Sequence, residues 1–138
     1  MRNASKILLI VGAIVSIVVA VIFLIVGAIM AVAAAVPTSE IVAQIQNGTI
    51  TTTASGTTEQ QAEAIKVMST GLAAFFLIVG VFNIVNTVLA FVANAKKAKG
   101  LYIANIVFGV LSLTEVTLVG GIFGLIANGQ EEKNKMFA

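Results

Sequence analysis

The side chains that most often carry enzyme chemistry are scarce in this sequence. The chain has no cysteine and no histidine, so it offers no thiolate nucleophile, no imidazole base and no nitrogen or sulfur ligand for zinc. Among its six acidic residues, Glu59 and Glu63 are four residues apart on a predicted helix, and we interpret them as a solvated face. No nucleophile–base pair, metal-binding cluster or phosphate loop is recognisable. The sequence therefore predicts no enzyme, no cofactor and no metal site.

One acidic residue, Glu115, differs from the others because it lies inside a long apolar segment. An ionisable residue within a membrane segment is costly and is often functional. Two interpretations stay open at this stage. Either Glu115 lies at a loop apex in contact with water, or it is buried and interacts with a proton or cation, with Asn105 or Ser112 beside it. The apolar segments contain no lysine or arginine that could pair with it.

Small and hydrogen-bonding residues recur at helical spacing in the apolar segments. Membrane helices pack through small residues, and a buried asparagine must find a partner because lipid offers none. In the second segment such residues are 3, 4, 3 and 4 positions apart and share one face: Gly80, Asn83, Thr87, Ala90 and Asn94. The first segment carries a matching stripe of Gly12, Ser16, Ala20, Gly27, Ala31 and Ala34, and the third carries Asn105, Gly109, Ser112, Gly120 and Gly124. The stripes predict packing within one chain, an interface between copies, or the lining of a polar path.

The composition indicates the class of protein to which these stripes belong. Hydrophobic residues make up 59% of the 138 residues and charged residues 10%, whereas soluble domains carry roughly 25% charged residues. No charge falls within 7–36 or 67–95, and only Glu115 falls within 101–130. Such stretches exceed the ~20 apolar residues that cross a bilayer. We therefore predict an all-α integral membrane protein, a small bundle of three apolar segments. A net charge of +2 from scattered residues gives no nucleic-acid-binding face.

The charge pattern divides this single membrane domain into six parts. They are a span at 7–36, a Thr-rich loop at 37–66, a span at 67–95, a basic turn at 96–100, an apolar segment at 101–127 and a polar tail at 128–138. The apolar core at 7–30 is longer than the roughly 7–15 residues of a cleavable signal, so we expect it to be retained. Pro37 should end the first helix. Thr57 or Thr58, with Gln60 or Gln61 three residues on, is a capping sequence for the second.

The third apolar segment, 101–127, permits two structures. A single helix would be about 40 Å long and would fit a tilted span. Alternatively, the sequence from Ser112 to Thr117 forms the apex of a helical hairpin. Its arms of about 12 residues would reach only ~18 Å, so the hairpin would be re-entrant or would need a locally thinned bilayer. The chain would then have three or four spans. A glutamate costs ~2.5–3.5 kcal/mol at the bilayer centre, which favours an apex near water.

The basic residues predict the orientation of the chain, because cytoplasmic flanks carry the excess of lysine and arginine. Two crossings put both basic clusters on one side: Arg2, Lys6, Lys96, Lys97 and Lys99. We therefore expect a multi-pass protein of the bacterial inner membrane with a cytoplasmic amino terminus. The loop at 37–66 would lie outside.

The basic turn and the third apolar segment also resemble part of a known family. The basic turn, Gly109-Val-Leu-Ser112-Leu and Gly120-Gly-Ile-Phe-Gly-Leu-Ile-Ala127 are similar to the carboxyl-terminal half of a family of small, uncharacterised Gram-positive membrane proteins. These are generally drawn with four spans and a larger loop after the first. The resemblance covers 96–127 and implies a four-segment architecture, with no established activity to carry over. This chain departs from the pattern by turning polar directly after Ala127, which shortens any fourth span.

These features together predict a non-enzymatic membrane protein that acts through helix–helix contacts and through the loop at 37–66. It would serve as an accessory or scaffold subunit, or as an immunity- or stress-type partner. The alternative is a homo-oligomeric pore lined by polar residues of the second span, with Glu115 as a further candidate. A second alternative is a transporter subunit. The expected partners are the lipid bilayer and either another copy or another membrane protein.

Overall fold

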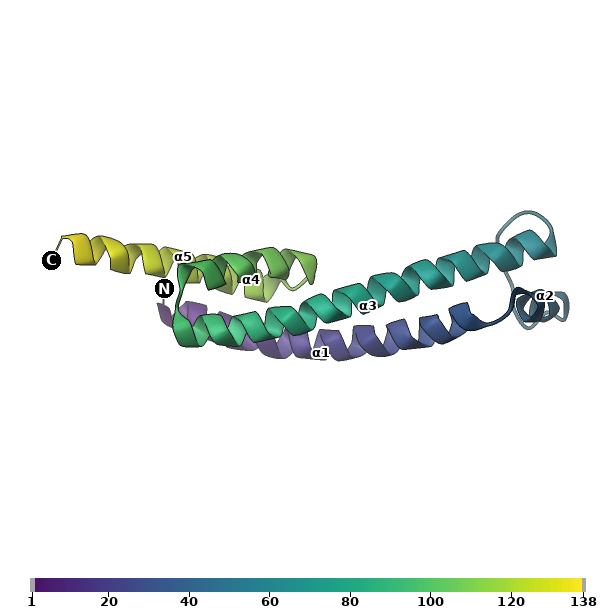
Figure 1. Cartoon of the computed structure of the whole chain (residues 1–138), viewed down its shortest axis with the longest axis horizontal. Helices are drawn as coiled ribbons and strands as arrows, with labels where there is room; N and C mark the ends of the chain where they lie inside the picture. The colour runs from purple at the N-terminus through teal and green to yellow at the C-terminus, as the bar shows by residue number, and fades with distance from the viewer. Residues whose placement is uncertain (1, 138) are drawn as a thin grey trace. The chain divides into compact units, whose positions relative to one another are not determined.

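The computed structural model describes residues 2–137, and these form five α-helices and no strand (Figure 1). The helices are α1 (Arg2–Ala35), α2 (Thr38–Gln46), α3 (Thr58–Lys96), α4 (Lys99–Leu111) and α5 (Glu115–Met136). The prediction of an all-helical protein is confirmed. Two of the helices, α1 and α3, are long and apolar enough to cross a membrane by length and composition.

Local sequence signals account for where the long helices begin and end. Helix α1 ends at Ala35, two residues before Pro37, because the residue before a proline is disfavoured in helical conformation. Helix α3 begins with the predicted capping box. The Thr57 backbone N–H donates to Gln60 Oε1 (3.0 Å), and the Gln60 N–H donates to Thr57 Oγ1 (3.4 Å). Both predictions from these residues are confirmed.

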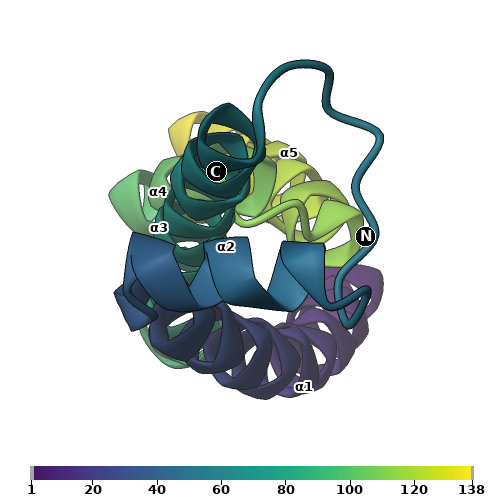
Figure 2. The same ribbon diagram turned by 90° about the vertical axis from the view of Figure 1, so that its right-hand side faces the viewer.

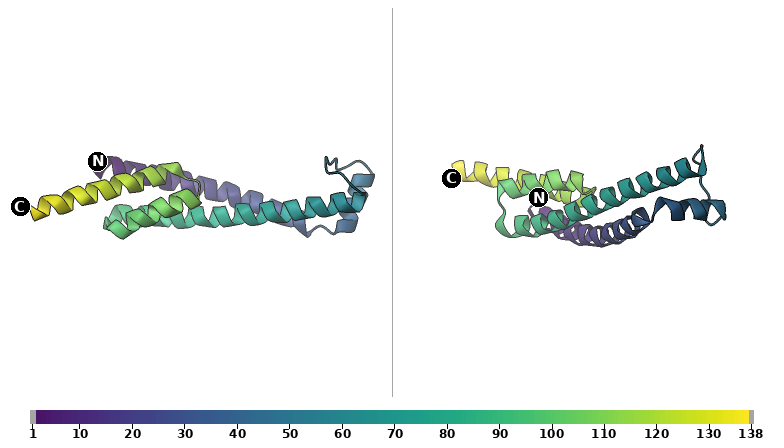
Figure 3. Two further views of the ribbon diagram at one scale, coloured as in Figure 1. Left: turned by 90° about the horizontal axis from the view of Figure 1, so that it is seen from above. Right: turned by 45° about the vertical axis from the view of Figure 1, so that its right-hand side comes forward.

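The third apolar segment folds as two helices rather than one. Helix α4 ends at Leu111 and α5 begins at Glu115, and the two run antiparallel, side by side (Figures 1 and 3). The hairpin is therefore the alternative that forms, with its turn at residues 112–114. Helix α5 continues to Met136, so most of the predicted polar tail is helical. Lys133 and Lys135 lie in its last turn, where positive charge favours the helix dipole.

The chain divides into two compact units. Unit 1 comprises the described residues up to 23 and from 79 onward, which are the first two thirds of α1, the second half of α3, and the hairpin of α4 and α5. Unit 2 comprises residues 24–78. In unit 2, α2 runs across the parts of α1 and α3 that belong to this unit (Figure 2), with Ile41, Ala62 and Ala73 buried.

Small side chains occupy most of the core, and many large apolar side chains point outward. The core cluster of unit 1 comprises Leu9, Ala13, Ala90, Ala93 and Tyr102. By contrast, Ile14, Ile25 and Val88 are each more than half exposed. A water-soluble bundle places its large apolar residues inside and its polar residues outside, which is the reverse of this arrangement.

Candidate functional site

Unit 1 encloses a group of amide and hydroxyl side chains at the level where α4 turns into α5. We call this group the polar cluster. Its members are at most 6% exposed and come from α1, α3, the turn and α5: Ser16, Asn83, Asn86, Thr87, Ser112, Thr114 and Thr117. Buried polar groups are costly unless they are hydrogen-bonded. Their hydrogen-bond partners therefore show what the cluster does.

The turn at 112–114 closes α4 with a Schellman motif. The Leu113 backbone N–H donates to the Val110 carbonyl (3.2 Å), and the Thr114 N–H donates to the Gly109 carbonyl (2.9 Å). This motif requires a left-handed residue, and Leu113 takes that conformation with a φ of +58°. Glycine is the usual residue here because a side chain costs roughly 1–2 kcal/mol in this conformation.

Asn83 binds the turn from the neighbouring helix. Its Nδ2 donates to the Ser112 carbonyl (2.9 Å) and to the Val79 carbonyl of its own helix (2.9 Å). Its Oδ1 accepts from the Thr114 hydroxyl (2.8 Å). The carbonyls at a helix end have no partner within the helix, and Asn83 supplies one for Ser112. Both the nitrogen and the oxygen of the Asn83 side-chain amide are therefore hydrogen-bonded.

Asn86 joins three parts of unit 1. Its Nδ2 lies 2.7 Å from Thr117 Oγ1 on α5, and 3.2 Å from both Ser16 Oγ on α1 and Ser112 Oγ in the turn. An amide nitrogen has two hydrogens, so three oxygen acceptors share them. The Asn86 Oδ1 is buried and has no partner among the described residues. Leaving such a group unpaired costs about 1–3 kcal/mol.

Sequence reasoning missed Asn86, Thr114 and Thr117 as site residues. The predicted stripe stepped from Asn83 to Thr87 and passed over Asn86. A second asparagine three residues after the first lies on nearly the same helical face. That spacing in an apolar segment was the signal that could have identified it. Thr114 and Thr117 gave no comparable signal, because their role depends on where the turn forms.

The predicted stripes are mostly buried where small residues allow close helix approach. Buried members are Gly80, Asn83, Thr87 and Ala90 on α3, Gly12, Ser16, Ala20 and Gly27 on α1, and Asn105, Gly109, Ser112, Gly120 and Gly124 in the hairpin. A Cβ on Gly12 would lie 2.9 Å from the Thr117 backbone nitrogen, and one on Gly120 would lie 3.1 Å from that of Leu9. Asn94 is only half-buried, and its Oδ1 has no partner among the described residues.

At the end of the predicted stripe on α1, Ala31 is exposed and Ala34 is half-buried. Met30 is half-buried instead of Ala31. A face that follows a period of 3.5 residues steps three positions after a step of four. After Gly27, that period leads to Met30 rather than Ala31.

Glu115 is exposed at the hairpin apex as the first residue of α5. The predicted neighbours are wrong as partners. The Asn105 Nδ2 donates to the Leu101 carbonyl (3.1 Å), and the Ser112 hydroxyl bonds within the polar cluster. Both are buried inside unit 1, whereas Glu115 is exposed. It lines a groove of about 240 Å³, which we call the apex groove, together with Gly109, Val110, Leu113 and Leu118.

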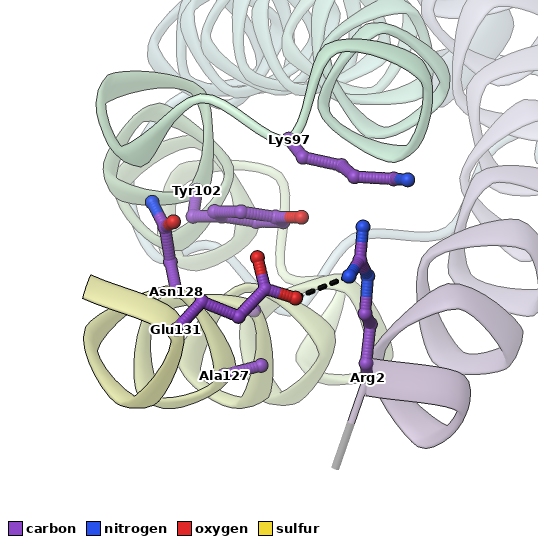
Figure 4. Close-up of a pocket in the computed structure, with 7 residues that line it drawn as sticks. Arg2, Lys97, Tyr102, Ala127, Asn128 and Glu131 are labelled. Atoms are coloured by element: carbon purple, nitrogen blue, oxygen red, sulfur yellow. Dashed lines mark hydrogen bonds and ion pairs between the residues drawn. The ribbon is translucent and has the colours of Figure 1, made fainter. Parts of the chain in front are cut away.

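Charged residues meet at the other end of the hairpin, where α4 begins (Figure 4). Arg2 forms an ion pair with Glu131. A cavity of about 10 Å³ lies among Arg2, Lys97, Tyr102, Asn128 and Glu131, with Gly124 and Ala127 completing its lining. The fold therefore brings the beginning of α1, the lysine turn and the end of α5 together. Two of the residues predicted to set topology, Arg2 and Lys97, line one cavity.

Comparison with protein-family models, with curated proteins and with solved structures found no match for this chain. The resemblance of residues 96–127 to a Gram-positive membrane family therefore stays a prediction.

Proposed function

We propose that this chain is a non-enzymatic integral protein of the bacterial inner membrane, and that it acts as an accessory or scaffold subunit for another membrane protein. One observation carries this proposal. In unit 1 the polar cluster is enclosed and hydrogen-bonded, while Ile7, Ile14 and Val88 are each more than half exposed. An apolar surface of that kind aggregates in water. In lipid it is the ordinary surface of a helix bundle.

In this proposal α1 and α3 cross the membrane, and the hairpin of α4 and α5 enters from the cytoplasmic side and returns to it. Helix α4 has 13 residues and is about 20 Å long, which is shorter than the ~30 Å hydrocarbon core. A turn at that depth needs protein partners for its free backbone groups. The contact of Asn83 with the Ser112 carbonyl meets this need. The meeting of Arg2, Lys97 and the end of α5 supports a shared cytoplasmic side.

The same contacts favour a scaffold over a pore. Pores are lined by polar side chains that face water. Asn83 and Thr87 are buried, and the Thr87 hydroxyl lies within hydrogen-bonding distance of the Asn83 carbonyl (2.9 Å) and of the Ala13 carbonyl on α1 (3.4 Å). A scaffold role also explains why the turn at 112–114 exposes an apolar side chain on its surface, since a partner protein would cover it. Leu113 is 66% exposed, and non-helical backbone at membrane depth is tolerated only where protein or water covers it.

Single cysteines test this arrangement in living cells, because the natural chain has none. We expect Asn83→Cys and Thr87→Cys to resist a membrane-impermeant maleimide. Thr53→Cys, at an exposed position of the predicted external loop, should react from outside, and Lys99→Cys only after the cells are opened. Rapid labelling of the cysteine at position 83 in intact cells would instead support the pore.

Native mass spectrometry of the protein extracted from its own membrane tests the scaffold role. We expect a complex with a second, different membrane protein. A closed ring of several identical copies would contradict the proposal. The same chain expressed alone provides the control, and we expect it to lose the second mass.

A further inference from the structure

We propose that the apex groove is the docking site for a transmembrane helix of another protein, and that this helix carries a lysine or arginine near the middle of the membrane. The inference rests on the proposed function and specifies the chemistry of the partner. It is drawn from the groove's size, from the depth of Glu115, and from the absence of a matching positive charge in this chain.

The apex groove is suited to a side chain rather than to a small ligand. Its volume of about 240 Å³ is below the ~300–1,000 Å³ typical of small-molecule sites. Its walls are apolar except at Glu115. Val110 is 58% exposed and Leu113 is 66% exposed, so both present apolar surface to a neighbour. An aliphatic stem ending in a positive charge matches this combination, because such side chains lie along apolar surface and place the charge at a polar group.

The depth of Glu115 makes its charge unusual. Helix α4 begins at Lys99, near the basic end of unit 1, and its 13 residues carry the chain about 20 Å away. In a hydrocarbon core of ~30 Å, the hairpin apex then lies beyond the midplane but short of the opposite surface. A carboxylate at this depth needs a partner.

This chain supplies no such partner. Among the described residues, Glu115 makes no hydrogen bond and no ion pair, and the ion pair of Arg2 with Glu131 lies at the other end of the hairpin. A second copy would not supply one either. Every lysine and arginine lies outside the apolar segments 7–36, 67–95 and 101–127. Charge complementarity at this depth therefore points to a different protein.

The backbone of the turn supports the same assignment. Leu113 adopts a left-handed conformation that favours glycine. Its side chain is mostly exposed, so contacts within this chain offset little of that strain. The leucine becomes useful when a neighbouring helix covers it. Backbone strain of this kind is typical of positions with a functional role.

A membrane two-hybrid selection tests the proposal with the full chain. The probe is a library of single-span helices built from Leu, Ala, Ser and Gly, with Lys, Arg, Gln or Leu at the centre. We expect helices with a central Lys or Arg to be enriched over those with Leu by at least about tenfold. That factor corresponds to about 1.4 kcal/mol, at the low end of measured coupling between close charges.

Two substitutions of Glu115 separate charge from fit. Glu115→Gln has nearly the same shape and should abolish the preference for Lys and Arg. Glu115→Lys should reverse it, so that helices with a central Asp or Glu are enriched from a matched library. Val110→Trp keeps the carboxylate but fills the groove, and should reduce binding of all library helices. Immunoblots of the membrane fraction confirm that each variant inserts.

The outcomes distinguish this inference from the proposed function. If helices bind the chain equally well whatever their central residue, the docking inference is overturned and the scaffold proposal stands. If the selected helices bind Glu115→Gln as well as they bind the natural chain, the inference is overturned in the same way. If no library helix binds and native mass spectrometry of the extracted protein shows only copies of this chain, both are overturned.

Discussion

Unit 1 contains side-chain hydrogen bonds between residues that are far apart in the chain, whereas those described in unit 2 join near neighbours. In unit 1, Asn86 bonds to Ser16, which is 70 residues away, and Ser5 donates to the Gly120 carbonyl, 115 residues away. In the described part of unit 2, a typical case is the Thr70 hydroxyl, which donates to the Lys66 carbonyl one helical turn back. Specific polar contacts therefore join the helices of unit 1 to one another, and the side-chain hydrogen bonds described in unit 2 are local.

The largest loss of stability is expected for substitution of a tightly packed glycine in unit 1, compared with a glycine in unit 2 that has open space around it. Gly12→Val places a Cβ 2.9 Å from the Thr117 backbone nitrogen and should destabilise the protein by about 3 kcal/mol, because overpacking pushes α1 away from α5. Gly71→Val in unit 2 is the matched control, since nothing lies within 4 Å of its Cβ position. Unfolding in detergent, followed by circular dichroism, measures both. Equal losses for the two variants would contradict the difference in packing.

The next largest effect concerns the polar cluster. Asn86→Leu removes the amide that contacts Ser16, Ser112 and Thr117, and should cost about 2 kcal/mol because these hydroxyls lose a partner. Thr70→Val in unit 2 removes one exposed local bond and should cost less than about 0.5 kcal/mol. The free energy of unfolding of both variants is measured in one detergent. A cost below about 0.5 kcal/mol for Asn86→Leu would mean that the cluster does not stabilise unit 1.

Two positions with left-handed backbone conformation, one in each unit, should change stability in opposite directions when they are substituted. Gly48→Leu in unit 2, at a φ of +77°, should cost about 1 kcal/mol. Leu113→Gly in unit 1, at a φ of +58°, should instead stabilise the fold by about 0.5 kcal/mol, since it relieves strain at some loss of chain rigidity. Thermal unfolding midpoints give both signs. A destabilised Leu113→Gly variant would show that the leucine side chain packs within its own chain.

The smallest effect is expected at the exposed end of unit 1. Glu131→Gln breaks the ion pair between Glu131 and Arg2. Both side chains are about half exposed, so the substitution should lower the free energy of unfolding by only about 0.3 kcal/mol. The loss should vanish at high salt because exposed charges are screened. The adjacent Glu132→Gln serves as the control, and it should show no dependence on salt beyond that of the natural chain. A salt-independent loss for Glu131→Gln would argue that the pair is buried in solution.

Much of the helical framework was predictable because its signals are local. Pro37 ends α1, Thr57 and Gln60 begin α3, and the small residues on one face of each segment are mostly buried. Each of these features depends on residues within one or two helical turns. Their energies act before any distant contact forms, so they can be read from the order of residues alone.

The tertiary structure decided the features that depend on distant neighbours. Length and composition allowed residues 101–127 to form one helix or two, and the hairpin forms with Asn83 and Asn86 bonded to its turn. The same contacts bury Thr117 and leave Glu115 outside, although the two are separated by one residue. A buried amide must pair with whatever polar group lies at its own depth on another helix. Which polar groups lie at the same depth is decided only when α1, α3 and the hairpin pack together. It therefore cannot be predicted from any single stretch of the sequence.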